Sequence, residues 1–131
     1  MKNLWSPWRS QYIDSLHKDK SSGNGCIFCD AVNQNINDES SLLVEKGELT
    51  FTILNLFPYN NGHLMIVPYR HISDYQLLTD DENLEIMKKL QLAEKALKTI
   101  YSPDGFNIGA NLGKVSGAGI EDHIHFHIVP R

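Results

Sequence analysis

The stretch DHIHFHIVPR at residues 122–131 constrains the fold more than any other part of this chain. Histidine occupies every second position, at His123, His125 and His127, and the positions between them are apolar. This alternation matches the two-residue period of a β-strand, in which successive side chains point to opposite faces. The stretch therefore predicts a strand with three imidazoles on one face and a core-forming face on the other.

A row of three imidazoles is costly to bury unless each ring has a polar partner. We therefore favour a functional role for the row over a purely structural one. The rings could ligate a metal ion. Alternatively, one imidazole could attack phosphorus and form a phosphoramidate that is later passed to another acceptor. The second chemistry requires one bare ring nitrogen, a partner for the other nitrogen, and donors for the phosphate oxygens.

A glycine-rich segment directly precedes the histidines, with Gly113, Gly117 and Gly119 between Asn111 and Ile120. Glycine lets backbone N–H groups approach an anion closely, so this segment could supply the phosphate donors. A plain hairpin loop without a ligand is the alternative.

The pattern over residues 80–100 predicts a long amphipathic helix. Thr79 and Glu82 form the sequence signature of a capping box. Glu85 and Lys89 are spaced as an i,i+4 ion pair on the solvent side. The apolar stripe is expected at Ile86, Leu90, Ala93, Leu97 and Ile100. Strands are expected at 49–54, 63–67 and 106–112 and at the histidines. Strands on both sides of one long helix indicate an α+β fold with an antiparallel sheet.

Composition excludes several classes of protein. The 131 residues suit one domain, and the net charge of -4, without a basic stripe, disfavours a nucleic-acid partner. No apolar run is long enough to cross a membrane. The N-terminus does not resemble a secretory leader, so we expect a cytoplasmic protein. Residues 1–25 are expected to be an aromatic arm and linker, followed by a domain over 26–131.

The two cysteines, Cys26 and Cys29, are separated by two residues. Two cysteines are too few for a disulfide framework, and this spacing indicates metal binding or redox chemistry. A pair of ordinary free cysteines is the remaining alternative.

Two motifs together resemble the histidine triad (HIT) family. The first is His123-Ile-His125-Phe-His127-Ile-Val, and the second is the stretch from Asn55 to His71, in which Gly62-His63 opens a strand ending in Val67-Pro68. The similarity covers residues 26–131. It implies a HIT-like fold: an antiparallel sheet of about five strands, one long helix and one short helix, usually in a homodimer and in some cases a tetramer. It also implies nucleotidyl hydrolase or transferase activity at the α-phosphate.

The resemblance assigns roles to individual residues. His125 would be the nucleophile, His127 would contact the phosphate or bridging oxygen, and His63 would complete the cluster. The nucleotide-binding residues would be Asn55 on the ribose, with Asn111, Gly117, Gly119 and Ile120 around the α-phosphate. Cys26, Cys29, His71 and His123 match a Cys2His2 zinc set of some bacterial members, so we expect a structural zinc and no redox cofactor.

Residues 116–131 and the N-terminal WSPWR resemble the bacterial branch that contains diadenosine tetraphosphate phosphorylases. That branch normally continues past Val-Pro-Arg, so we expect the domain to be shortened at Arg131. The resemblance implies cleavage of dinucleoside polyphosphates through a nucleotidyl-histidine, with water or phosphate as acceptor. A nucleoside phosphoramidate hydrolase and a low-turnover nucleotide-binding module are the alternatives.

Overall fold

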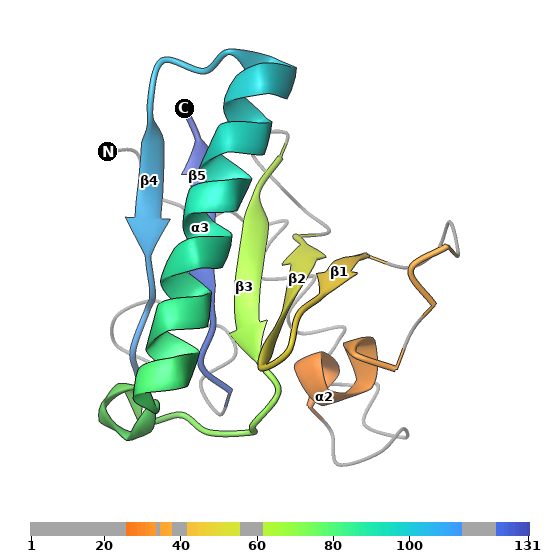
Figure 1. The fold of residues 1–131 in the computed structure, drawn as a ribbon, viewed down its shortest axis with the longest axis vertical. Coiled ribbons are helices and arrows are strands. Elements are labelled where there is room, and N and C mark those ends of the chain that lie inside the picture. The colour runs from red at the N-terminus through yellow and green to blue at the C-terminus, as the bar shows by residue number, and fades with distance from the viewer. Residues whose placement is uncertain (1–25, 34, 38–41, 56–61, 114–122) are drawn as a thin grey trace.

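A computed structural model describes residues 26–33, 35–37, 42–55, 62–113 and 123–131. Within these residues, five strands form one sheet in the order β1-β2-β3-β5-β4, with every neighbouring pair antiparallel (Figure 1). The strands are β1 (Leu43–Lys46), β2 (Thr50–Leu54), β3 (Leu64–Pro68), β4 (Phe106–Gly109) and β5 (Phe126–Pro130). The helices are α2 (Ile27–Ala31), the 3-10 turn η1 (Tyr75–Leu77) and α3 (Asp80–Tyr101). The predicted α+β architecture with one long helix is confirmed.

Helix α3 begins at the predicted capping box. The Thr79 hydroxyl accepts a hydrogen bond from the Glu82 N–H at 3.1 Å, and the Glu82 carboxylate accepts one from the Thr79 N–H at 2.9 Å. These bonds satisfy two of the backbone donors that a helix start leaves without partners. The helix ends at Tyr101, and its C-cap residue Ser102 has a left-handed φ of 47°.

The expected apolar stripe of α3 is buried from Ile86 to Leu97, but the prediction for Ile100 is wrong, since it is 67% exposed. Gly62, two residues before β3, already lies against Leu97. The last turn of α3 therefore lies beyond the start of β3, and none of the described strands covers Ile100.

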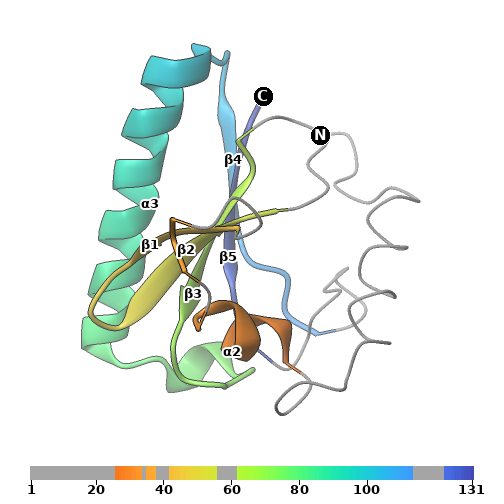
Figure 2. The ribbon, with the colours of Figure 1, turned by 90° about the vertical axis from the view of Figure 1, so that its right-hand side faces the viewer.

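The sheet separates two cores. Figure 2 shows α3 along one face of the sheet and α2 on the other side. Leu64 and Ile66 belong to the core under α3, whereas Met65 and Val67 pack with Phe28 of α2. This division follows from the two-residue period of β3, which sends alternate side chains to opposite faces.

Two predicted strands are shorter than expected. His123 and His125 lie before β5, so His127 is the only triad histidine within the strand. The ladder with β3 cannot extend to the segment before β5 in the regular way, because Pro68 has no N–H to donate. The Ile124 N–H instead donates to the Ile72 carbonyl at 2.7 Å. β4 ends at Gly109, the partner of His127.

The expected arm and linker at 1–25 lie outside the described residues. Among the residues that the structure describes, no helix is both long enough and apolar enough to cross a membrane.

Candidate functional site

Three of the predicted histidines meet on the sheet face that α2 covers. His127 pairs with Met65 across β5 and β3, so its side chain shares the Met65 face. His63 precedes β3 at a position of the same parity. The ring centroid of His127 lies 5.0 Å from that of His63 and 4.9 Å from that of His125. All three side chains are buried, with at most 4% of their surface exposed.

His125 is held in one orientation by its own backbone neighbourhood. Its Nδ1 atom lies 2.9 Å from the carbonyl oxygen of His123. A carbonyl oxygen can only accept, so Nδ1 carries the proton. The neutral ring of His125 therefore has its lone pair on Nε2, the nitrogen that a nucleophilic imidazole needs.

The Nε2 atom of His63 lies 2.8 Å from Nδ1 of His127, and its Nδ1 atom lies 3.1 Å from the side-chain nitrogen of Asn55. Asn55 is buried and also donates its backbone N–H to the His63 carbonyl at 3.0 Å. The three side chains thus form a hydrogen-bonded chain from Asn55 through His63 to His127.

Gly62 places His63 against the sheet. Its φ is +87°, a conformation that glycine adopts at little cost. A Cβ atom at this position would lie 2.7 Å from Leu97 Cδ2 and 2.8 Å from Tyr101 Cε2. The glycine of the Gly62-His63 motif is therefore required both by backbone conformation and by the close approach of α3.

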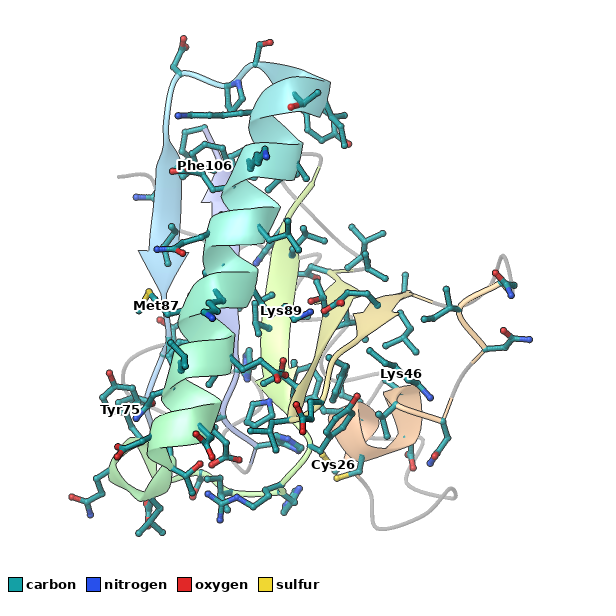
Figure 3. The ribbon with its side chains drawn as sticks, in the orientation of Figure 1. Cys26, Lys46, Tyr75, Met87, Lys89 and Phe106 are labelled. Carbon is teal, nitrogen blue, oxygen red and sulfur yellow. The ribbon has the colours of Figure 1, made fainter. Side chains whose placement is uncertain are left out.

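A second cluster contains the four predicted metal ligands. The donor atoms of Cys26, Cys29, His71 and His123 all lie within 4.8 Å of one another. Cys26 Sγ is 3.3 Å from His123 Nδ1, and Cys29 Sγ is 3.4 Å from His71 Nδ1. Figure 3 shows Cys26 at the start of α2, close to the sheet.

These four residues fit a tetrahedral zinc ion. Zn–S and Zn–N bonds of about 2.3 and 2.0 Å place neighbouring ligand atoms roughly 3.6 Å apart. The Sγ to Nδ1 distances of 3.3 to 3.7 Å are close to this value. His123 Nε2 also donates to the Pro68 carbonyl at 2.7 Å, which leaves Nδ1 bare and directed at the sulfurs. Burial lowers the pKa of His123, which keeps the ring neutral, as ligation requires.

The burial of Cys26 also favours a role as a metal ligand. Burial is the main cause that raises the pKa of its thiol above the ordinary value. A buried thiol is a poor nucleophile, whereas a bound cation favours its thiolate. This environment therefore suits a metal ligand better than a redox cysteine.

The predicted nucleotide-binding residues are only partly described. Asn55 is 5% exposed and lies beside the histidine cluster. Asn111 is half-buried and follows Gly109, the partner of His127, by two residues. Gly117, Gly119 and Ile120 lie outside the described residues.

Sequence reasoning did not identify Phe28 as part of the site. This residue lies between the two cysteines, is fully buried, and has its ring centroid 4.8 Å from that of His125 and 5.5 Å from that of His123. An apolar residue inside a Cys-x-x-Cys segment gives no indication of such a contact, because the contact depends on how α2 docks on the sheet.

A hollow of about 600 Å³ lies at α3, on the opposite side of the sheet from the histidines. It is bordered by the β1–β2 turn at Leu49 and by Leu84 and Lys88 of α3. None of the predicted site residues lines it, so it has no part in the histidine chemistry.

Comparison with known proteins agrees with this geometry. A family model described as the HIT domain matches residues 37–131, so the chain belongs to the HIT family. It is 39% identical to an AP-4-A phosphorylase of Mycobacterium tuberculosis, over 100% of this chain and 68% of that protein. It is 30% identical to an adenosine 5'-monophosphoramidase of Schizosaccharomyces pombe, over 81% of this chain and 74% of that protein.

One similar solved structure contains zinc, the metal predicted for the cysteine cluster. The crystal structure of a zinc-bound histidine triad family protein from Mycobacterium smegmatis matches with a TM-score of 0.68 and 28% identity. The match covers 81% of this chain and 74% of that one.

Proposed function

We propose that the chain cleaves dinucleoside polyphosphates at the α-phosphate through a nucleotidyl-His125 intermediate, with water or inorganic phosphate as acceptor. The broader class, a HIT-type nucleotide hydrolase or transferase, follows from the family and from the names of the relatives. The observation that carries the proposal is the 2.9 Å contact between His125 Nδ1 and the His123 carbonyl.

In the first step, His125 Nε2 attacks the α-phosphorus, and the bond from that phosphorus to the bridging oxygen breaks. The Nδ1–H bond to the His123 carbonyl stabilises the positive charge that the ring gains. His127 lies beside His125 and donates a hydrogen bond to the leaving polyphosphate oxygen or to the phosphoryl oxygen, and the polyphosphate leaves with the electron pair of the broken bond. In the second step, water or phosphate attacks the phosphorus, the P–N bond breaks, neutral His125 leaves with its Nε2 lone pair restored, and the proton of the attacking oxygen is released to solvent.

The remaining roles belong to the same proposal. Asn55 would bind the ribose, and Asn111 with Gly117, Gly119 and Ile120 would hold the α-phosphate of an adenine nucleotide. Cys26, Cys29, His71 and His123 would hold a structural zinc, which would fix α2 against the sheet and would supply no step of the reaction. We further propose that the chain forms a homodimer.

Nucleoside phosphoramidate hydrolysis is a second candidate, which the likeness to the monophosphoramidase supports. The same nucleophile would serve, and the bond broken at the phosphorus would be to an amine nitrogen, which takes a proton from solvent, in place of a bridging oxygen. The two candidates differ in the leaving group.

A product analysis tests the proposal. The protein is incubated with diadenosine tetraphosphate, with and without inorganic phosphate, and the nucleotides are separated. ADP plus ATP formed only with phosphate indicates a phosphorylase, and AMP plus ATP formed without phosphate indicates a hydrolase. The His125→Ala variant should lose turnover in either case and still bind nucleotide. Turnover that survives this substitution contradicts the role of His125, and bound but uncleaved substrate contradicts the choice of substrate.

A further inference from the structure

We infer that Asn55 is a positioning residue that sets the tautomers of His63 and His127, so that the proton of His127 is placed on Nε2. The placement of the protons follows from the geometry alone. Only its consequence for catalysis rests on the proposed function.

The first step is the contact between Asn55 and His63. The two residues face each other directly after the last pair of the β2–β3 ladder, joined by the backbone hydrogen bond from the Asn55 N–H to the His63 carbonyl. Opposite residues of antiparallel strands direct their side chains to the same face. The Asn55 amide nitrogen lies 3.1 Å from His63 Nδ1. An amide nitrogen only donates, so Nδ1 of His63 must accept and carries no proton.

The second step transfers this constraint to His127. A neutral imidazole with a bare Nδ1 carries its proton on Nε2. His63 Nε2 lies 2.8 Å from His127 Nδ1, so it donates to that atom. Nδ1 of His127 is then the acceptor, and the proton of His127 is on Nε2. Two hydrogen bonds and one amide group therefore fix the tautomers of two histidines.

In this protein the group that starts the series of hydrogen bonds is a donor, the amide of Asn55. An aspartate at position 55 would have nearly the same shape, but its carboxylate only accepts. It would attract a proton to Nδ1 of His63, either by reversing the tautomer or by charging the ring. Asparagine can also present its amide oxygen to a ribose hydroxyl, so one residue could serve the nucleotide and the histidines together.

The protons can be observed directly in the protein without nucleotide. We would label the histidine rings with ¹⁵N and record long-range ¹H–¹⁵N correlations at pH about 8, above the usual imidazole pKa near 6.5. His63→Gln and His127→Gln variants assign the signals among the six histidines. We expect both rings to show a protonated Nε2 and a bare Nδ1. A proton on Nδ1 of either ring in the unsubstituted protein overturns the inference, with no variant needed.

The Asn55→Asp variant tests the cause. We expect it to place a proton on His63 Nδ1. The matched control is Asn107→Asp in β4, which puts a carboxylate on the same sheet face, since Asn107 pairs with Val129 two residues from His127. The control should leave the His63 and His127 signals unchanged. A bare His63 Nδ1 in Asn55→Asp, or the same change in both variants, overturns the inference.

Kinetics separate this inference from the proposed function. If the chain cleaves diadenosine tetraphosphate, Asn55→Asp should lower kcat about 100-fold, the usual scale for the loss of one hydrogen-bond donor to the transition state. A loss confined to KM, together with the expected tautomers, would limit Asn55 to ribose binding and overturn its catalytic consequence. If the unsubstituted protein shows the expected tautomers but no turnover, the proposed function fails while the assignment of the protons stands.

Discussion

His125 Nδ1 lies 2.9 Å from the backbone oxygen of His123, and the ring of His123 faces both cysteine sulfurs. The proposed nucleophile is therefore oriented by the backbone of a proposed metal ligand. Any change that moves His123 also moves the acceptor that holds His125. The cysteine cluster and the histidine cluster are thus mechanically connected, although their side chains have different roles.

The first prediction concerns the metal. The purified protein should contain one zinc ion per chain, and Cys26→Ser should lose it. We expect this loss to lower the free energy of unfolding by more than about 3 kcal/mol, because a structural metal contributes its binding energy to folding. Metal analysis and urea denaturation measure both effects. Zinc added after chelation should restore the unsubstituted protein but not the variant, and an unchanged stability in Cys26→Ser would contradict the metal site.

The second prediction concerns Phe28, whose ring lies against His125. Phe28→Leu should cost about 1 kcal/mol of stability and lower kcat about 10-fold, since the imidazole loses a rigid neighbour. The matched control is Phe51→Leu, in the same core, where the ring stacks on Tyr69 at 5.7 Å. The control should lose similar stability and keep its kcat. Equal losses of kcat in the two variants would show that Phe28 only supports packing.

The regular elements could be predicted from the sequence because each depends on local chemistry. The capping box at Thr79 and the stripe from Ile86 to Leu97 follow from helical periodicity, and both are confirmed. Ile100 continues the same periodicity, but its exposure depends on where β3 begins. Local patterns carry no information about the relative ends of a helix and a strand.

The motifs could locate the chemistry but not its connections. Glu85 and Lys89 have the spacing of an exposed ion pair, but Glu85 accepts from the Thr50 hydroxyl and Lys89 pairs with Glu45. Both side chains reach the β1–β2 hairpin, which the helix pattern alone does not reveal. The contact between Phe28 and His125 is likewise a result of tertiary packing. Spacing along the chain specifies which groups are present, and docking of the elements specifies which groups they meet.

The third prediction concerns Gly62. Gly62→Ala should lower the free energy of unfolding by about 2 to 3 kcal/mol, because φ is +87° and the new Cβ would lie within 2.8 Å of Leu97 and Tyr101. Displacement of His63 should also reduce kcat. Gly105→Ala is the control, since no atom lies within 4 Å of its Cβ position. Urea denaturation of both variants checks the prediction, and similar stabilities for the two would refute the steric argument.

The fourth prediction concerns the pH dependence of the Arg70–Glu82 ion pair, whose Nη2 and Oε1 atoms are 2.6 Å apart. Arg70 lowers the pKa of the buried Glu82 carboxyl from 4.5 to about 2. A lowered pKa means that the pair stabilises the fold fully above about pH 4.5. This stabilisation is lost progressively as the pH falls toward about 2.

Glu82→Gln should therefore cost about 2 kcal/mol at neutral pH, the usual scale for a hydrogen bond to a charged group. The amide oxygen can still accept from the Thr79 N–H, so the capping box is retained. Urea denaturation is carried out at neutral pH and at a pH midway between 4.5 and about 2. The difference in free energy of unfolding between the variant and the unsubstituted protein should be smaller at the acidic pH. Asp81→Asn, an exposed change in the same helical turn, should cost less than about 0.5 kcal/mol. If the difference in free energy of unfolding between Glu82→Gln and the unsubstituted protein does not change with pH, the charge of Glu82 does not stabilise the fold. Protonation of the carboxyl would then have no effect on stability.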